Sequence, residues 1–301
     1  MNEQNKINLL NHGYVKLLNL SGPVRRVFKE DTEAGQQYAE GLLSYDCFID
    51  QDEVREFDAD DTDPALTARI SFNNFDKERT REQDLRLVEY LMKNKHNSPL
   101  EMIEAWFELK VPIFIARQIH RHRVFVYNEV SARYSVLPEE WYIPRVVGGK
   151  PTNGMKQGQE NNLTHLEQVV FITQLDEHCK NGYKLYSEAI VAGIAPEHAR
   201  LFLQVNHYTH FIMKGNLHNW MNFLTLRLDK HAQIEARIYA QAIYDLLKQY
   251  LPETMKLFDK HRRLVPQSGK PREVLVKEIA NTKFSELSED ELNSIYAILG
   301  K

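Results

Sequence analysis

The sequence predicts an α+β protein in which several helices pack on a small, mostly antiparallel sheet. Long helical patterns cover the second half of the chain, at about 163–193, 196–205 and 231–250. Strand-type patterns are few, and they do not alternate with helices as the strands of a doubly wound parallel sheet would. With 301 residues, 43% of them hydrophobic and 27% charged, the chain has the size and composition of a single globular domain.

The first third of the chain predicts one weak strand and two helices. The weak strand covers residues 7–20, where apolar residues stand among polar neighbours. Asp63-Pro64 supplies an N-cap and a proline at the first helical position, which predicts a helix over Ala65–Phe72. A second helix is expected from about 77 to 95, with an apolar face formed by Leu85, Val88 and Met92.

The middle of the chain carries the clearest strand patterns. Ser98-Pro99-Leu100-Glu101 has the spacing of a capping box and predicts a helix start. Residues 103–111 alternate between apolar and polar side chains, as a half-buried strand does. Pro112 begins a short helix, a second strand is expected at Tyr208–Met213, and a further helix covers 217–225.

Three segments lack the patterns of regular secondary structure. Eight acidic residues and one arginine lie between Asp50 and Asp63, which predicts a solvated acidic insertion at about 22–60. Four glycines between residues 145 and 162 indicate a mobile loop. A C-terminal extension begins at about 265 and carries no functional pattern. The expected organisation is one domain over residues 1–301 with this insertion and this extension.

The composition limits the classes of partner. No apolar run reaches the roughly 18 residues that a membrane helix needs, and the first residues, MNEQNKINLL, lack a signal-peptide pattern. The net charge of −4 argues against a nucleic-acid partner. Two cysteines, Cys47 and Cys179, form no disulfide or ligand framework, so we expect a cytoplasmic protein.

The densest polar segment is residues 117–133. It contains four arginines, two histidines and no lysine. Guanidinium groups are planar and bind phosphate with two parallel hydrogen bonds, which a flexible ammonium group does not. No GxGxxG or GxxxxGK[ST] loop is present, so any phosphate must be bound by such a cluster of arginines.

Other interpretations of this segment remain open at this point. The arginines could form a partly buried ion-pair network around Glu129. His120 and His122 could be a metal pair, although Arg121 and Arg123 flank them and a catalytic zinc usually needs a third protein ligand. A basic patch for nucleic acid is a further alternative.

A second group of polar residues lies on the helix predicted at 217–225 and just beyond it. Asn219 and Asn222 are three residues apart, so both can point to the same side. An amide offers both a donor and an acceptor, which suits the edge of a flat heterocycle. An ordinary wet helix face is the alternative. The group consists of Asn216, His218, Asn219, Asn222, Arg227 and His231.

Together the two groups resemble a known family. Arg121-His122-Arg123, seven residues, and then Ser131 match the RHR-x7-S motif of flavin-dependent thymidylate synthases, also called the thymidylate synthase-complementing protein family. The longer pattern RQxxRHRxxSxNExSxRY matches from Arg117 to Tyr134, with one exception. Residues 68–72, 96–101 and 216–233 also agree. The resemblance is strong over about 62–145 and 196–250.

The resemblance implies a fold and a function. It implies the fold of this family and reductive methylation of dUMP to dTMP. Methylenetetrahydrofolate would donate the carbon, and FAD reduced by NADPH would act as reductant. It further implies a homotetramer in which several subunits build each active site, and a methyltransferase that needs no metal.

The resemblance also implies roles for individual residues. Arg227 would be catalytic and would stabilise negative charge on the uracil ring. FAD would contact Ser98, Arg121, His122, Arg123, Glu129, Asn216, His218 and Asn222. The nucleotide dUMP would be held by Gln118, Arg121, Glu129, Ser131, Ala132, Arg133, Arg200 and Arg227.

No enzyme nucleophile is expected. Neither cysteine stands in a cationic setting that would lower the pKa of a thiol. Ser131 has no evident base partner, and the nearby arginines suit a phosphate-binding hydroxyl better. The family likewise dispenses with a nucleophile.

Three positions depart from the family pattern. Val126 stands where the family usually has serine, and Met102 where a histidine is common. His218 stands where many members have arginine, and a neutral imidazole is a weaker phosphate or flavin contact. These departures put ligand affinities in question and leave the reaction class unchanged.

Overall fold

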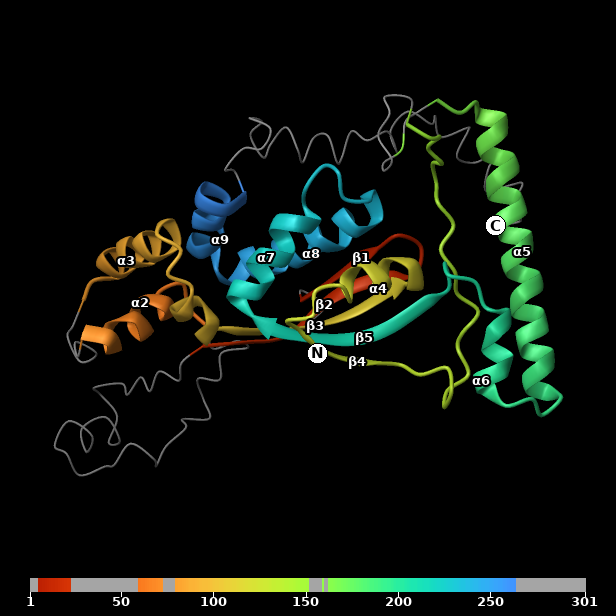
Figure 1. The fold of residues 1–301 in the computed structure, drawn as a ribbon, viewed down its shortest axis with the longest axis horizontal. Coiled ribbons are helices and arrows are strands. Elements are labelled where there is room, and N and C mark those ends of the chain that lie inside the picture. Colours follow the sequence, from red (N-terminus) through yellow and green to blue (C-terminus); the bar gives the residue numbers. More distant parts are fainter. Residues whose placement is uncertain (1–4, 23–58, 73–78, 152–158, 160–161, 264–301) are drawn as a thin grey trace.

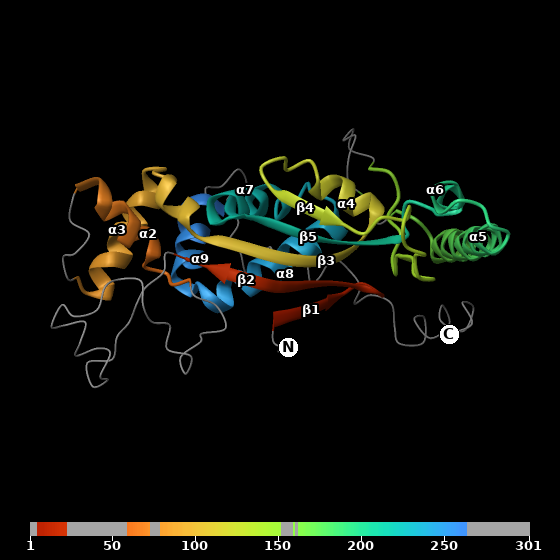
Figure 2. The ribbon, with the colours of Figure 1, turned by 90° about the horizontal axis from the view of Figure 1, so that it is seen from below.

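In the computed structural model of this chain, five strands form one antiparallel sheet in the order β1-β2-β3-β5-β4. The structure describes residues 5–22, 59–72, 79–151, 159 and 162–263. Figure 2 shows the sheet with its strands side by side. The strands are β1 (Lys6–Leu9), β2 (Gly13–Ser21), β3 (Glu104–Pro112), β4 (Val126–Glu129) and β5 (Tyr208–Asn216).

The helices lie in three groups around this sheet (Figure 1). One group covers a face of the sheet and consists of α4 (Ile113–Ile119), α7 (Leu217–Arg227) and α8 (Ile234–Tyr250). A second group lies at one end and consists of α2 (Asp63–Ala68), α3 (Arg81–Lys93) and α9 (Pro252–Phe258). At the other end lie α5 (His165–Val191) and α6 (Pro196–Ala199). Short helical turns are η3 (Arg69–Phe72), η4 (Ser98–Met102), η5 (Arg200–Phe202) and the π-helical η6 (Asp259–Arg263).

The alternation in β3 decides which face of the sheet is covered. Ala105, Phe107 and Leu109 are fully buried beneath the helices, whereas Trp106 on the opposite face is 36% exposed. Successive strand residues point to opposite faces, so a single strand can bury one row of side chains and expose the other. The expected half-buried strand is therefore confirmed.

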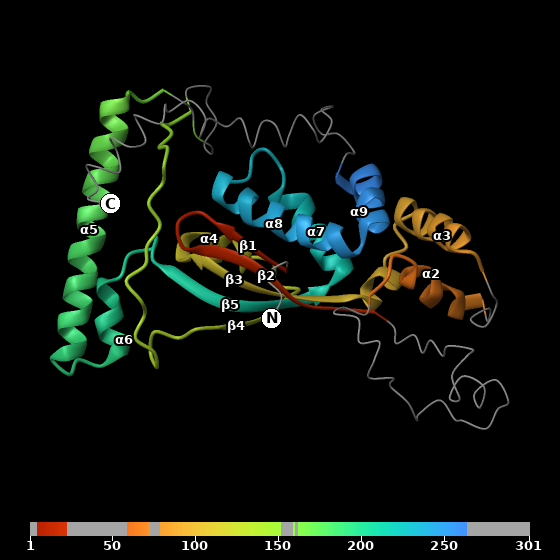
Figure 3. The ribbon, with the colours of Figure 1, turned by 180° about the vertical axis from the view of Figure 1, so that it is seen from behind.

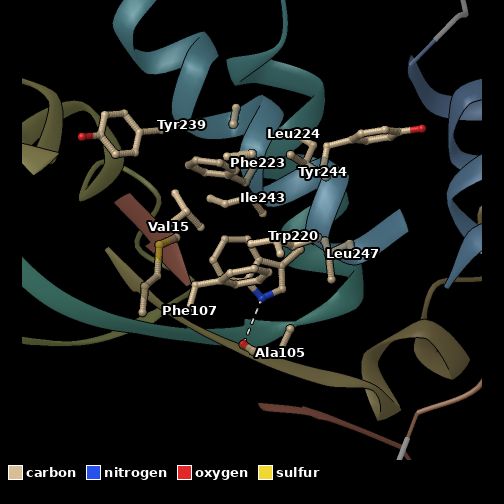
Figure 4. Packing of buried hydrophobic residues seen from close by; sticks show 14 of the residues in the cluster. Val15, Ala105, Phe107, Trp220, Phe223, Leu224, Tyr239, Ile243, Tyr244 and Leu247 are labelled. Atoms are coloured by element: carbon tan, nitrogen blue, oxygen red, sulfur yellow. Dashed lines mark hydrogen bonds between the residues drawn. The ribbon is translucent and has the colours of Figure 1, made fainter. Parts of the chain in front are cut away.

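Trp220 fixes α7 on the sheet. Its ring packs edge-on against Phe107, with centroids 4.8 Å apart, in the cluster shown in Figure 4. Its indole nitrogen donates to the carbonyl oxygens of Ala105 and Gly215, both at 3.1 Å. A fully buried indole N–H that found no acceptor would cost roughly 1–3 kcal/mol, so these bonds select one position for the helix.

The α+β class with an antiparallel sheet is confirmed, but several element boundaries differ from the prediction. The weak strand at 7–20 is a hairpin, since residues 10–12 form a turn between β1 and β2. The strand β4 was not predicted. The helix expected at 196–205 is only the four-residue α6 followed by η5, and the capping-box segment forms a 3₁₀ turn.

The end of the acidic stretch is folded into the domain, contrary to the expected solvated segment. Asp61 is 1% exposed and accepts hydrogen bonds from the backbone N–H groups of Thr254, at 2.7 Å, and Glu253, at 3.2 Å. It therefore satisfies free N–H groups at the start of α9. Asp63 is also buried, and α2 begins at this residue, two residues before the predicted start at Ala65, with Thr62 instead of Asp63 at the N-cap position. Most of the expected insertion at 22–60 lies outside the described residues, as do the extension from about 265 and part of the 145–162 loop.

Helix α5 stands away from the helices that cover the sheet, as Figures 1 and 3 show from opposite sides. It is attached through the segment before it, and through Asn206 after it, whose amide nitrogen lies 3.2 Å from the sulfur of Cys179. Asp176 accepts from the indole nitrogen of Trp141 at 3.0 Å, and the hydroxyl of Tyr186 accepts from the backbone of Leu137 at 3.0 Å. Within the described ranges, none of the helices has the length and apolar character required to cross a bilayer.

Candidate active site

The arginine-rich segment folds as the end of α4, a tight turn and the start of β4. Tyr127, on β4, closes this turn, because its hydroxyl donates to the carbonyl of His122 at 2.9 Å and to that of Ile119 at 3.2 Å. The carbonyl of Ile119 also accepts from the backbone N–H of His122 at 3.0 Å, so the Tyr127 hydroxyl adds a second bond there and supplies a partner for the carbonyl of His122. The turn presents Arg121 and Arg123 to solvent and turns His122 inward, where it is only partly exposed.

Arg227, the last residue of α7, binds this turn directly. Its Nε donates to Nε2 of His122 at 2.9 Å, and its Nη2 donates to the carbonyl oxygen of Gln118 at 2.6 Å. The geometry therefore brings together three of the predicted site residues, from two elements that are about a hundred residues apart in the chain.

His122 is a neutral acceptor in this arrangement. Burial, reinforced by the charge of Arg227, lowers the pKa of His122 to about 4. Because Nε2 accepts a hydrogen bond, the ring proton of the neutral imidazole must be on Nδ1. The ring also packs edge-on against Phe223, with centroids 4.8 Å apart, so its orientation is fixed by the core beneath it.

The environment of Arg227 contains no carboxylate among the described residues with which it interacts. Burial lowers the pKa of Arg227, and Tyr127 is the group whose effect opposes this shift. A guanidinium whose partners are a neutral ring and a carbonyl keeps its full positive charge available to a ligand. This arrangement suits stabilisation of negative charge on a bound molecule.

Gln118 is held by a residue to which the sequence analysis gave no role. Its side-chain amide donates to Oε1 of Gln233 at 2.6 Å. Gln233 is the N-cap residue of α8, so this bond joins the end of α4 to the start of α8. The segment around Gln233 belongs to the predicted resemblance, but its contact with Gln118 depends on the tertiary structure.

Asn216, His218 and Asn222 lie along the first turns of α7. Asn216 is the N-cap residue, and its Oδ1 accepts from the backbone N–H of Asn219 at 2.9 Å. The side chains of His218 and Asn222 are hydrogen-bonded, with Nε2 and Nδ2 3.1 Å apart. The predicted polar face of this helix therefore exists. Asn219 is turned toward the RHR turn, where its Nδ2 lies 3.4 Å from the carbonyl of Val124.

The remaining predicted nucleotide contacts form a separate group at α6. Arg133 forms an ion pair with Glu197, with Nε and Oε2 3.4 Å apart, and Nε of Arg200 donates to the carbonyl of Glu197 at 3.3 Å. Ser131 is partly exposed, and its hydroxyl oxygen accepts from the backbone N–H of Arg133 at 3.3 Å. Ala132 is 9% exposed.

The group on α7 (Asn216, His218 and Asn222) and the group at α6 (Arg133 and Arg200) lie at opposite ends of β5 (Figure 1). The strand has nine residues and spans roughly 27 Å. Arg200 precedes its first residue, whereas His218 and Asn222 follow its last. A single copy of the chain therefore does not bring all predicted substrate and cofactor residues to one place.

Glu129, predicted to contact both ligands, ends β4. Its Oε1 accepts from the hydroxyl of Thr209 at 2.5 Å, and the residue is exposed. The hypothesis of an arginine network around Glu129 is not what the structure shows among the described residues. The carboxylate binds a neutral threonine, and Arg133 forms an ion pair with Glu197 instead.

The two histidines of the His120-x-His122 pair have different surroundings. His120 packs against the rings of Tyr127 and Phe211, with centroids 4.6 and 4.8 Å away, and burial lowers its pKa. Nε2 of His122 is already an acceptor for Arg227. Over the described ranges, no group of three or more histidine, cysteine, aspartate or glutamate side chains could hold a metal ion.

The donor groups around the RHR turn and α7 fit an anionic ligand with a flat ring system. Arg121 and Arg123 in this turn and Ser98 in η4 are exposed, as are the apolar side chains of Val124, Val126 and Met102. Guanidinium groups and a hydroxyl suit phosphate, whereas the amides suit a heterocycle edge. A flavin nucleotide has both parts, so the residues present fit such a group.

The fold and this site define a class of protein whose exposed arginines and amides suit a phosphate-bearing heterocycle, and whose sequence contains no glycine-rich phosphate loop. A family model described as "Thymidylate synthase complementing protein" matches residues 54–253. The chain belongs to this family, which confirms the prediction from the RHR motif.

Individual relatives agree with this assignment. A flavin-dependent thymidylate synthase from Rickettsia bellii is 36% identical over 247 residues, which cover 77% of this chain and 83% of the relative. A flavin-dependent thymidylate synthase from Thermus thermophilus is 38% identical over 215 residues, which cover 71% of this chain and 77% of the relative. The crystal structure of a UMP/dUMP methylase, PolB from Streptomyces cacaoi, has a similar fold, with a TM-score of 0.66. It is 23% identical and covers 86% of this chain and all of that chain.

Proposed function

We propose that this chain is a flavin-dependent thymidylate synthase, a methyltransferase that converts dUMP to dTMP. The proposal rests most directly on Arg227, a half-buried cation held by the neutral side chain of His122 and the carbonyl of Gln118. The relatives from Rickettsia bellii and Thermus thermophilus are named for this activity.

Arg227 has the role of stabilising charge on the pyrimidine. Uracil C5 is a poor nucleophile, and its attack on a one-carbon electrophile is favoured when negative charge can accumulate on the ring oxygens. A fixed guanidinium beside the ring lowers the energy of that charge without having to reorganise during the reaction. The C5 proton must then leave, and the transferred methylene must gain a hydride to become a methyl group.

A flavin supplies that reducing power when it is bound. We assign its contacts to the residues implied by the resemblance: Ser98, Arg121, His122, Arg123, Glu129, Asn216, His218 and Asn222. NADPH as the source of electrons and methylenetetrahydrofolate as the carbon donor belong to the same proposal.

The protein provides no covalent nucleophile in this scheme. Cys179 is fully buried in α5, lies 3.5 Å from Oδ1 of Asn206, and has a thiol pKa raised by burial. Ser131 accepts a backbone hydrogen bond and has no base within the interactions of the described residues. Cys47 lies outside those residues. We therefore assign Ser131 to dUMP binding, together with Gln118, Arg121, Glu129, Ala132, Arg133, Arg200 and Arg227.

We further propose that the chain acts as a homotetramer of single-domain subunits with shared sites, in the cytoplasm. The separation of Arg200 from His218 and Asn222 supports this, because a second copy could place one group against the other. Helix α5 and the segment after it also expose apolar side chains, as a subunit contact requires. They are Leu166, Val170, Phe171, Val191, Ile194, Leu201 and Phe202.

Shared sites make a direct prediction about mixed oligomers. Arg200→Gln and Arg227→Ala should each be inactive alone. Co-expressed, they should regain up to about a quarter of the wild-type activity, since some sites draw an intact residue from each subunit. Size-exclusion chromatography with light scattering would give the mass of the oligomer. A monomer, or no regained activity, would contradict the shared site.

The reaction class is tested by tritium release from C5 of labelled dUMP. The assay contains methylenetetrahydrofolate, NADPH and FAD, and is repeated without NADPH and FAD. Release that requires both supports the proposed function. No release from folded protein loaded with flavin would mean that the motif serves binding alone.

A further inference from the structure

Arg262 is a cation beside His218, a residue to which we assign a flavin contact. The sequence patterns did not identify Arg262 as a site residue. It lies in η6, which packs against α7. Its Nη1 is 3.0 Å from Nδ1 of His218, and its Nη2 donates to Oδ1 of Asn97. Asn97 immediately precedes Ser98, so Arg262 connects two segments to which we assign flavin contacts.

The turn that carries Arg262 is held in place from two sides. Lys260 and His261 both bind Glu89 of α3, at 2.5 and 3.0 Å from its Oε1. Asp259 accepts from the hydroxyl of Tyr244 in α8 at 2.7 Å. The neighbours of Arg262 thus anchor η6 to α3 and α8, while Arg262 itself is directed toward α7.

Both side chains that bind Arg262 are neutral. A guanidinium has no acceptor, so Nδ1 of His218 must accept, and the proton of that ring is on Nε2. The Asn222 amide, whose oxygen and nitrogen are interchangeable by rotation, can then accept from Nε2 with its oxygen. Burial and the charge of Arg262 lower the pKa of His218, whereas Glu101 acts in the opposite direction.

Arg262 is therefore a partly buried cation without an internal counter-charge in the part of the chain that the structure describes. Its pKa is lowered by burial, and no carboxylate acts on it there. Taking a guanidinium out of water is costly unless an anion compensates it. Its neighbour Arg263 differs, because Nη1 of Arg263 lies 3.5 Å from Oδ1 of Asp259.

We infer that Arg262 binds a phosphate group of the flavin nucleotide, and that it works with His218 and Asn97 as a single anion-binding unit. The inference rests on the proposed flavin site. The unit explains how a neutral histidine can stand at position 218, since the positive charge comes from η6 instead of from α7.

The test compares flavins that differ in phosphate. Apoprotein is titrated with FAD, FMN and riboflavin, and binding is followed by the quenching of flavin fluorescence. We expect Arg262→Gln to weaken FAD binding about tenfold to a hundredfold, the usual effect of one charge-assisted hydrogen bond, and to leave riboflavin binding nearly unchanged. Arg262→Lys should recover part of the loss.

A matched control separates this effect from a general change of charge. Lys256→Gln removes the same charge from an exposed ion pair with Glu253 on α9, and it should leave the FAD affinity unchanged. Thermal melting reports whether each variant folds. Equal FAD affinity of wild type and Arg262→Gln would overturn the inference, as would an equal loss for riboflavin and FAD.

A second variant keeps the inference testable if Arg262→Gln does not fold. Asn97→Asp keeps the shape of the side chain but gives Arg262 an internal carboxylate, which competes with the phosphate. Like Arg262→Gln, it should weaken FAD binding and should not weaken riboflavin binding. Unchanged FAD affinity in this variant would also overturn the inference. Failure of the wild-type protein to bind any flavin would instead contradict the proposed function.

Discussion

Nε of Arg227 donates to Nε2 of His122 at 2.9 Å, which joins the end of α7 to the turn between α4 and β4. This bond requires a neutral imidazole, and burial together with the charge of Arg227 keeps it neutral by lowering the pKa of His122 to about 4. The histidine of the RHR motif thereby orients the proposed catalytic arginine, in addition to any contact with a flavin.

Arg227→Ala should abolish dTMP formation while the protein still binds FAD. Removal of one preorganised charge-stabilising group typically costs about 10²–10³-fold in rate. Tritium release from dUMP measures turnover, and flavin absorbance measures the bound cofactor. Unchanged turnover would remove Arg227 from the mechanism. Arg237→Ala on α8 offers a control in which a different arginine is lost.

A Cys47→Ala, Cys179→Ala double variant should keep its activity. Cys179 is fully buried beside Asn206, so its thiol is not available to a substrate. The substitution removes a buried sulfur atom, and we expect a loss of about 1 kcal/mol in the free energy of unfolding. Denaturation and tritium release are measured on the same preparation. Loss of activity in the folded variant would reopen covalent catalysis by cysteine.

Substitutions at Asn216 separate its role as a helix cap from a role in flavin binding. Asn216→Ala loses the bond to the N–H of Asn219, which should lower the free energy of unfolding by about 1 kcal/mol. Asn216→Ser retains a capping oxygen and should be nearly as stable as wild type. If Asn216 also binds the flavin, both variants should bind FAD more weakly, because both lack the amide. Normal FAD affinity in Asn216→Ser would assign the residue to capping alone.

The free energy of unfolding should fall as the pH is lowered from about 6.5 to about 4. Burial lowers the pKa of His207, which is 1% exposed, to about 4, so the unfolded chain takes up a proton on this residue first. The loss from His207 amounts to at most about 3 kcal/mol and is complete below about pH 4. Burial also lowers the pKa of His122 to about 4, so His122 adds to the fall in the free energy of unfolding over the same pH range.

Urea denaturation at several pH values checks this expectation. His207→Gln should flatten the pH dependence, whereas His178→Gln, which removes an exposed histidine from α5, should leave it unchanged. An identical slope for wild type and His207→Gln would contradict the assignment.

Local patterns were sufficient for the elements with strong signals of their own. The alternation in β3 and the prolines at the starts of α2 and α4 act between neighbours in the chain, so they can be recognised without the fold. The four-residue strand β4 was missed, because its pairing with β5 supplies the stability that its own short sequence does not. The burial of Asp61 was missed for a similar reason, since its partners at the start of α9 are about 190 residues away.

By itself, the sequence determined the family and the residue types of the site, because a motif as long as that from Arg117 to Tyr134 is specific in the order of its side chains. Only the tertiary structure decided which of these side chains meet. It paired Arg227 with His122, brought Arg133 to Glu197 beside Arg200, and brought Arg262 to His218. The physical reason is that hydrogen bonds and charges act over a few ångströms in space, and the packing of α7 and η6 sets those distances.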